Sequence, residues 1–532
     1  MVFAGTGLDA QVPAPHVRIA QGELEGAPTG MGPFVFKGIP YAAPPVGDQR
    51  WREPRSAPGW SGIFLATRFG PDCMQPESSN SPRSAMSENC LFLNVWTPSV
   101  KSAQLAPVMV WIHGGSFVSG AGSLPGYDGT RLAMRGVVIV TINYRMGVFG
   151  YMAHPELSAE SPNHTSGNYA LLDQMAALRW VRDNIAEFGG DPHNVTVFGE
   201  SAGASSIAYI MASPLANGLF DKAILESPGL LMTAEPELRR DYRGITNMEA
   251  VGLAVGPHIA DLRALSADAL MEQSYAASKK LFGPGGTGRI RLRAATPLDD
   301  PNGVHLPWTP FADGSIIPDQ LARLYAENRF MHMPVMAGTN TNEGNLFLTH
   351  FRPANADGFN AWVEQAYTPC GKAVLAQYAA SLATPDQVHA AADRLLTDSL
   401  FLYGSFSVAR ATHGYLYRFT RVSPRAEKQG LGAYHSAEIS YVFGHTLNAP
   451  DDYSDVDRKL SDQIMTMWVH FARTGDPRLM MSSEWTRIGS NGEVPYMDFG
   501  DTITPKDFPD TTVQIFSQLW PPSGKAPTCL KK

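Results

Sequence analysis

The sequence predicts an α/β fold in which helices flank a central, mostly parallel, twisted sheet. Apolar runs at 107–112 and 137–143 are typical of strands buried on both faces. They alternate with an amphipathic helix pattern at 168–188, which ends at the stop signal Gly189-Gly190-Asp191-Pro192, and with a short β-branched strand at 194–198. This alternation implies right-handed crossovers, and therefore strands that run parallel.

The rest of the chain is predicted to complete a single domain over residues 1–532. Strands are expected at 334–339 and 414–419 and a late helix at 461–474, with helical insertions between the later strands. A segment from about 235 to 302 shows no regular pattern and predicts an irregular insertion. No stretch has the composition of a linker between independent domains.

Composition excludes several classes of protein. The 532 residues are 44% hydrophobic and 17% charged, ordinary values for a globular protein with a sizeable core. The net charge of −8 gives no basic surface for nucleic acid. No apolar run approaches the roughly 18 residues of a membrane-spanning helix. We therefore expect neither a nucleic-acid partner nor a membrane span, and the sequence leaves the oligomeric state open.

The four cysteines bear on the compartment. Cys73 and Cys90 bracket a polar segment, and a bridge between them would close an Ω-like loop and stabilise the fold by about 3 kcal/mol. Cys370 and Cys529 are candidates for a second bridge. No Cys-x-x-Cys pair supports a zinc or redox site. Residues 1–21 lack the apolar region of a signal peptide. We expect a processed secreted or periplasmic form, with a cytoplasmic protein as the alternative.

A nucleophile motif occupies Gly199-Glu200-Ser201-Ala202-Gly203, which matches G-x-S-x-G. The strand at 194–198 enters it and a helix-compatible run at 204–212 leaves it. This is the strand–turn–helix setting that lifts a serine hydroxyl above the sheet at the positive end of a helix. The motif predicts an α/β-hydrolase fold with Ser201 as the nucleophile; an ordinary glycine-rich turn is the alternative.

A second glycine-rich segment, His113-Gly114-Gly115-Ser116, overlaps the end of the strand at 107–112. Hydrolases of this class place their other oxyanion donors at this point. The backbone amides of Gly115, Ser116 and Ala202 are the expected donors, and each such donor typically contributes about 10²- to 10³-fold in rate.

These motifs together resemble the type-B carboxylesterase family, which also contains the cholinesterases. The resemblance covers nearly the whole chain. Its motifs are Phe36-Lys37-Gly38-Ile39-Pro40-Tyr41-Ala42, the run from Glu88 to Trp96, and the run from Phe188 to Gly203. Cholinesterases carry a tryptophan for quaternary ammonium in the first cysteine loop, and Met74 to Asn89 contains none. A choline-specific site is therefore not expected.

The resemblance implies an acid and a histidine downstream, in the order Ser, Glu, His. Gly338-Thr339-Asn340-Thr341-Asn342-Glu343-Gly344 matches the acid motif, and His435-Ser436-Ala437-Glu438 the histidine motif. The implied triad is Ser201, Glu343 and His435. Glu438 is the nearest competing acid, and His113, His413 and His445 also lie near loops.

The resemblance implies contacts around this triad as well. It suggests Ser227 as a partner of the acid, and Glu200 lies next to the nucleophile. It also implies three bonded pairs: Arg50 with Glu88, Arg145 with Asp173, and Cys73 with Cys90.

These residues together predict a serine carboxylic-ester hydrolase that forms an acyl-enzyme on a small-molecule ester and needs no metal or cofactor. Arg289, Arg291 and Arg293 lie in the insertion expected near the active-site gorge. They suggest an anionic acyl group, such as the tricarballylate esters of fumonisin-type mycotoxins, unless they are a solvated basic segment. Alternatives are a broad-specificity short-chain or aryl carboxylesterase and, in another class, a non-catalytic adhesion protein.

Overall fold

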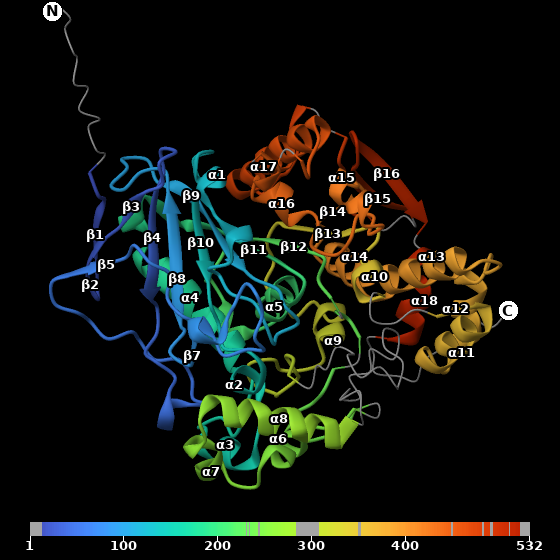
Figure 1. Cartoon of the computed structure of the whole chain (residues 1–532), viewed down its shortest axis with the longest axis horizontal. Helices are drawn as coiled ribbons and strands as arrows, with labels where there is room; N and C mark the ends of the chain where they lie inside the picture. Colours follow the sequence, from blue (N-terminus) through green and yellow to red (C-terminus); the bar gives the residue numbers. More distant parts are fainter. Residues whose placement is uncertain are drawn as a thin grey trace, which may run out of the picture.

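A mixed sheet of eleven strands forms the centre of the protein. The computed structural model describes residues 13–282, 308–348 and 353–521, apart from gaps at 230, 234, 243–244, 448, 450, 481–483, 490–492 and 510. Figure 1 shows the sheet passing through the molecule, with helices on both faces and a group of helices, α3, α6, α7 and α8, beyond one end of the strands.

The seven central strands of this sheet are parallel, as the alternating pattern predicts. The spatial order is β16-β15-β14-β13-β12-β11-β9-β10-β8-β4-β3, with antiparallel pairing only for β8, β4, β3 and β16 at the edges. The strands are β3 (Ala27–Pro28), β4 (Phe34–Pro40), β8 (Phe92–Thr97), β9 (Ala106–Ile112), β10 (Val138–Ile142), β11 (Gly190–Glu200), β12 (Lys222–Glu226), β13 (Val335–Asn340), β14 (Tyr415–Phe419), β15 (Glu493–Phe499) and β16 (Ile503–Pro509).

Within the described residues, two small sheets lie outside the main one. Strands β1 (His16–Ile19), β2 (Gly22–Glu25) and β5 (Ile63–Leu65) form the first, and β6 (Asp72–Cys73) with β7 (Met86–Ser87) the second. The helices are α1 (Thr130–Ala133), α2 (Gly147–Tyr151), α3 (Pro155–Glu160), α4 (Tyr169–Asn184), α5 (Ala202–Met211), α6 (Met248–Val255), α7 (Ile259–Ala264), α8 (Ala267–Phe282), α9 (Leu321–Ala326), α10 (Gly344–Phe347), α11 (Ala356–Ala366), α12 (Gly371–Tyr378), α13 (Pro385–Leu396), α14 (Tyr403–Ala411), α15 (Pro424–Lys428), α16 (Ile439–Val442), α17 (Asp455–Thr474) and α18 (Thr511–Leu519).

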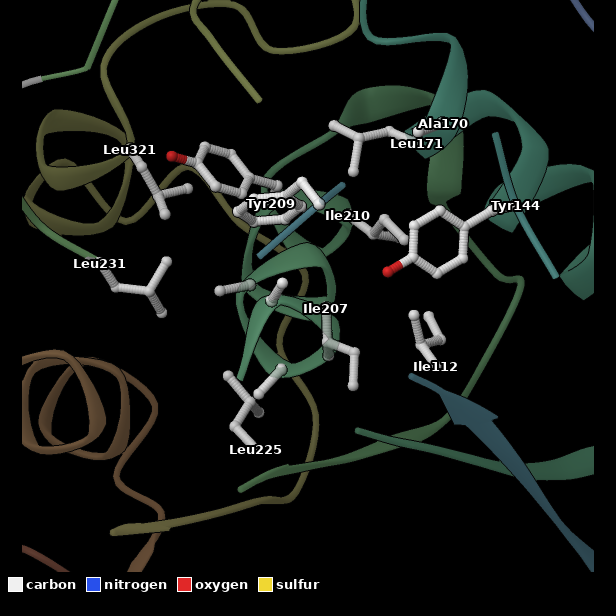
Figure 2. Close-up of a cluster of buried hydrophobic side chains, with 14 of the residues drawn as sticks. Ile112, Tyr144, Ala170, Leu171, Ile207, Tyr209, Ile210, Leu225, Leu231 and Leu321 are labelled. Atoms are coloured by element: carbon white, nitrogen blue, oxygen red, sulfur yellow. The ribbon is translucent and has the colours of Figure 1, made fainter. Parts of the chain in front are cut away.

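The sheet is buried on both faces because successive side chains of a strand point in opposite directions. In β9, Val108 and Val110 belong to one hydrophobic cluster, which includes α4 and α5, whereas Met109 and Trp111 belong to another, which includes α17. Figure 2 shows the first cluster around α5, where Ile207 lies near Ile112 of β9 and Leu225 of β12. This packing fixes α5, and hence the turn that precedes it, against the sheet.

Most of the predicted elements are confirmed, and three boundaries are wrong. Helix α4 ends at Asn184, four residues before the prediction, and a 3₁₀ turn at Ile185–Phe188 follows it. Strand β11 begins at Gly190, four residues before the prediction, because Gly190 already pairs with Ala106 and the pairing register then shifts before Val195. Helix α17 begins at Asp455, six residues before the prediction. Ser454 caps it by accepting a hydrogen bond from the amide of Asp457, whose side chain accepts one in return.

The prediction of an irregular insertion at about 235–302 is wrong for much of the segment. It contains α6, α7 and α8, and the side chain of Asn247 caps α6 by accepting from the amide of Ala250. Residues 248–282 are rich in Ala and Leu, which favour helix without a strict amphipathic pattern. Residues 283–307 lie outside the described part of the chain.

The disulfide and the two implied salt bridges are present. Cys73 and Cys90 are bonded. Cys529, the predicted partner of Cys370 in a second bridge, lies outside the described residues. The guanidinium of Arg50 contacts the carboxylate of Glu88 at 2.5 and 2.7 Å. The buried pair Arg145–Asp173 has contacts of 2.7 and 2.8 Å. Within the described ranges, none of the helices combines the length and apolar character needed to cross a membrane.

Replacement of Ile207 by alanine tests how firmly α5 is held. Ile207 is fully buried, so Ile207→Ala should lower the free energy of unfolding by about 2–5 kcal/mol, because lost apolar contacts and a residual cavity both destabilise. Urea-induced unfolding followed by tryptophan fluorescence measures the change. Ile63→Ala, at a side chain that is 50% exposed, is the matched control, and its effect should stay within about 0.5 kcal/mol. Equal effects of the two substitutions would contradict the burial of Ile207 against the sheet.

Candidate active site

Ser201 lies in the sharp turn between β11 and α5. Its backbone has φ 54° and ψ −122°, in the region of positive φ that is strained for a residue with a side chain. The amide of Ser201 donates to the carbonyl oxygen of Glu226 at 2.9 Å, and its own carbonyl accepts from the amide of Ser205. The turn is thus attached to β12 on one side and begins α5 on the other, and the side chain of Ser201 remains partly accessible.

The glycines of the nucleophile motif allow the turn to lie very close to β9. A Cβ atom at Gly203 would be 2.0 Å from the carbonyl oxygen of Ile112, and one at Gly199 would be 2.5 Å from the same atom. On the β9 side, a Cβ atom at Gly114 would be 3.0 Å from the Cβ of Ser201. Only glycine at these positions lets the glycine-rich segment after β9 reach the nucleophile.

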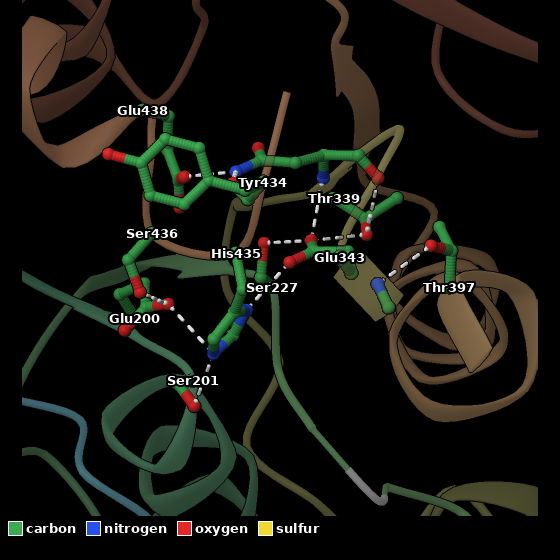
Figure 3. A network of polar contacts seen from close by, with 12 residues as sticks. Glu200, Ser201, Ser227, Thr339, Glu343, Thr397, Tyr434, His435, Ser436 and Glu438 are labelled. Carbon is green, nitrogen blue, oxygen red and sulfur yellow. Dashed lines mark hydrogen bonds and ion pairs between the residues drawn. The ribbon is translucent and has the colours of Figure 1, made fainter. Parts of the chain in front are cut away.

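The structure brings Ser201, His435 and Glu343 together, as Figure 3 shows. Nε2 of His435 lies 2.9 Å from Oγ of Ser201, and Nδ1 lies 2.6 Å from Oε2 of Glu343. A carboxylate can only accept, so in the neutral ring the proton belongs on Nδ1, which makes this shorter carboxylate contact. The lone pair of Nε2 can then accept the proton of the serine hydroxyl. The three residues therefore have the geometry of a nucleophile, its base and the acid that orients the base.

Glu343 is buried and held by several donors. Its Oε1 accepts from Oγ of Ser227 at 2.5 Å, from Oγ1 of Thr339 at 2.7 Å and from the amide of Asn340 at 2.7 Å. The family resemblance suggests the contact with Ser227, but sequence reasoning missed the other two donors. The signal was available, since Thr339 and Asn340 belong to the same motif and end strand β13.

The competing residues make different contacts. Glu438 accepts from the side chain of Asn340, and burial raises its pKa well above the usual range. The His113 ring stacks on Tyr144, and burial lowers its pKa to about 4. Nε2 of His445 contacts the carbonyl oxygen of Gly126 instead of a serine hydroxyl. Among these candidates, Glu343 is the acid that contacts His435.

Glu200 contributes a second carboxylate to the histidine. Its Oε1 lies 3.2 Å from Nε2 of His435 and accepts from Oγ of Ser436 at 2.5 Å. Burial raises the pKa of Glu200, while the charge of His435 and the hydrogen bond from Ser436 oppose that rise. Sequence reasoning placed Glu200 near the site but missed Ser436, although Ser436 follows the histidine directly.

The charge of His435 is set by these surroundings. Burial lowers the pKa of the imidazole, but the carboxylates of Glu200 and Glu343 outweigh that effect and raise the pKa to about 9. Protonation of Glu200 would remove part of this stabilisation and lower the pKa of His435. The same two carboxylates would stabilise the imidazolium that forms when the histidine takes a proton from the serine.

The expected oxyanion donors lie on both sides of the nucleophile. Gly115 has φ 105° and Ser116 has φ 56°, a conformation that favours glycine. Ser116 adopts it nevertheless, although it carries a side chain. The carbonyl of Gly115 accepts from the amides of Val118 and Ser119, which fixes the loop. Among the described residues, no group accepts a hydrogen bond from the amides of Gly115, Ser116 or Ala202.

Two aromatic rings pack on the histidine, and sequence reasoning missed both. The ring centroids of Phe401 and Phe347 lie 4.6 and 5.4 Å from that of His435. Phe401 belongs to a π-helical turn at Thr397–Leu402, between α13 and α14. Such turns occur often at functional sites, but they leave no clear pattern in a single sequence.

The arginines proposed for anion binding, Arg289, Arg291 and Arg293, lie outside the described residues. Within the described part of the chain, no group of three or more His, Cys, Asp or Glu side chains has the arrangement of a metal site.

Comparison with known proteins agrees with the fold and shows the family of the chain. The carboxylesterase family pattern matches residues 13–515. The chain is 37% identical over 486 residues to fumonisin B1 esterase of Sphingopyxis macrogoltabida, covering 88% of this chain and 84% of that protein. It is also 37% identical over 474 residues to para-nitrobenzyl esterase of Bacillus subtilis strain 168, covering 86% of this chain and 89% of that protein.

A solved structure of PNB esterase superposes on this chain with a TM-score of 0.75 and 32% identity, covering 94% of this chain and 99% of that one. The predicted α/β-hydrolase fold is therefore confirmed. Because the family pattern matches most of the chain, this chain belongs to the carboxylesterase family and is a carboxylic-ester hydrolase.

Proposed function

We propose that this hydrolase cleaves esters through an acyl-enzyme formed on Ser201. The observation that carries the proposal is the pair of contacts made by His435, 2.9 Å to Oγ of Ser201 and 2.6 Å to Glu343. His435 accepts the serine proton through Nε2 as Oγ attacks the ester carbonyl, and Glu343 holds the Nδ1–H tautomer. The non-catalytic adhesion alternative would require loss of this serine–histidine pair.

The negative charge of the tetrahedral intermediate falls on the former carbonyl oxygen, which the amides of Gly115, Ser116 and Ala202 receive. The C–O bond of the ester then breaks, and the leaving alcohol takes the proton from His435. Water attacks the acyl-enzyme in the same way, with His435 again as the base, and the carboxylic acid is released. The cycle needs neither a metal ion nor a cofactor.

For the substrate, we propose esters of polycarboxylic acids, with fumonisin-type tricarballylate esters as the leading case. The similarity to fumonisin B1 esterase, 37% over 486 residues, supports this choice. The arginines at 289, 291 and 293 would supply the positive charge that an anionic acyl group requires.

A broad-specificity short-chain or aryl esterase is the second candidate. The equal identity to para-nitrobenzyl esterase favours it. We also propose an oxidising compartment, secreted or periplasmic, with the cytoplasm as the alternative. The bond between Cys73 and Cys90 supports this, since such bonds are rare in reducing compartments.

The roles of the three residues can be separated by substitution. Ser201→Ala should lower kcat for p-nitrophenyl butyrate by about 10⁴- to 10⁶-fold, because no other group can form the acyl-enzyme. Glu343→Gln should lower it by about 10³- to 10⁴-fold, because an amide favours the wrong tautomer of His435.

Glu438→Gln is the matched control for the acid, since Glu438 is also buried and lies three residues after His435. Its loss should be at least about 10² smaller than that of Glu343→Gln. Circular dichroism establishes that each variant is folded. Full activity of folded Ser201→Ala, or a greater loss in Glu438→Gln than in Glu343→Gln, would contradict these assignments.

The pH dependence tests the part played by Glu200. Only neutral His435 accepts a proton, so kcat/KM should rise with pH through the pKa of His435. The charge of Glu200 raises that pKa, so Glu200→Gln should move the acidic limb of the kcat/KM profile to lower pH. Glu187→Gln, at an exposed acid, should leave the limb in place. If the acidic limb of Glu200→Gln stays in place or moves to higher pH, Glu200 does not raise the pKa of His435.

The substrate proposal is tested by removing the three arginines together. The ratio of kcat/KM for tricarballylate esters to kcat/KM for neutral esters should fall by about tenfold or more when all three become alanine. A variant with Arg18, Arg179 and Arg182 changed to alanine, all exposed, has the same net charge and serves as control. An unchanged ratio in the first variant would favour the broad-specificity alternative.

A further inference from the structure

A cavity of about 560 Å³ opens beside the segment that carries the oxyanion donors. Ser116 belongs to its lining, so the cavity adjoins the place where the ester carbonyl must lie. We call it the methionine pocket after the three methionines in its wall. Its main apolar residues are Met74, Val118, Met146, Phe149, Met271 and Trp308.

The walls of the methionine pocket come from distant parts of the chain that are bonded to one another. The side chain of Gln75, in the disulfide loop, accepts from the amide of Gly120 at 2.8 Å and donates to its carbonyl at 3.0 Å. This attaches the loop closed by Cys73 and Cys90 to the oxyanion segment.

Two contacts hold α8, the opposite wall. Arg83 of the disulfide loop makes a double contact with Asp268 at 2.6 and 2.8 Å. Nε1 of Trp308 donates to Oγ of Ser274 at 3.0 Å, and both side chains are buried. The disulfide loop, the oxyanion segment and α8 are therefore connected to one another. Because of these connections, the pocket is largely formed before any ligand enters, as is usual for small-molecule sites.

The chemistry of the wall selects an uncharged group. Among the described residues that line the pocket, Glu272 carries the only formal charge at neutral pH, and there is no lysine or arginine. The volume falls within the roughly 300–1,000 Å³ typical of ligand pockets. Methionine side chains are flexible and polarisable, so they adapt to the shape of an alkyl chain.

We propose that the methionine pocket binds an unbranched aliphatic chain of the ester substrate, next to the reacting carbonyl. This inference rests on the proposed function, because Ser116 links the pocket to the oxyanion site. The same chemistry can reside in the acyl part or in the alcohol part of an ester, and the experiment has one arm for each.

The acyl arm compares kcat/KM for p-nitrophenyl octanoate and p-nitrophenyl acetate, and the alcohol arm compares octyl acetate and ethyl acetate. Met271→Trp fills the pocket, and Met271→Gln keeps its size but adds a polar amide. In the arm that uses the pocket, the long-to-short ratio should fall by roughly tenfold in both variants, the effect of losing apolar contact with one or two methylene groups.

Ala276→Trp and Ala276→Gln are the matched controls. Ala276 lies on the same helix, is exposed and does not line the pocket. Circular dichroism shows that the Met271 variants are folded, and measurable turnover of the acetates by each variant shows that Ser201 still reacts. A long-to-short ratio that is the same in both Met271 variants and the wild type, in both arms, overturns the proposal.

Failure of the proposed function is distinguishable from failure of the pocket. If the wild-type protein hydrolyses none of these esters, 1-octanol binding is measured by calorimetry on the wild type and on Met271→Trp. Binding that weakens about tenfold or more in the variant supports an aliphatic site without esterase activity. Binding that is equal in the two proteins, or absent from the wild type, overturns it.

Discussion

The active-site arrangement depends on how closely the turn at Ser201 packs against strand β9. The carbonyl oxygen of Ile112 occupies the space in which a Cβ atom of residue 199 or 203 would lie. This close approach places the glycine-rich segment after β9 beside the nucleophile, so amides from two separate elements lie around one serine. Buried residues of α5 and β12 hold the turn in this position, which shows how a strained residue at 201 is maintained by the packing around it.

A second constraint is electrostatic. The side chain of His435 is buried between two carboxylates and two aromatic rings. Burial disfavours a charged ring, whereas Glu343 and Glu200 favour it. Glu343 is fixed by Ser227, Thr339 and the amide of Asn340, so it stays ready to accept from Nδ1. In the proposed mechanism, the site would therefore stabilise the imidazolium at the moment of proton transfer without exposing it to water.

Sequence alone predicted the parts of this protein that depend on local pattern. The parallel strands are recognisable because both of their faces are apolar, and Ser201 is recognisable because the turn requires glycine at fixed positions. Phe401 and the three helices at 248–282 were missed because their local sequence has no such pattern. A π-helical turn has no sequence rule, and the composition of those helices is helix-forming without a strict period. Contacts such as Glu200 with Ser436 join residues 236 positions apart and appear only when the chain is folded.

The charge of the methionine pocket also limits how a substrate with carboxylate groups can lie. Its described wall holds the carboxylate of Glu272 and no cation, so a second carboxylate would be repelled there and would lose its hydration. A polycarboxylate ester must then place its uncharged part in this pocket and its acid groups elsewhere. The positive charge for those groups has to come from outside this wall. Arg289, Arg291 and Arg293 follow α8 after six further residues in the sequence, so neighbouring segments of the chain would supply the apolar wall and the cations. The two proposals therefore concern opposite parts of one substrate, and each can be tested without the other.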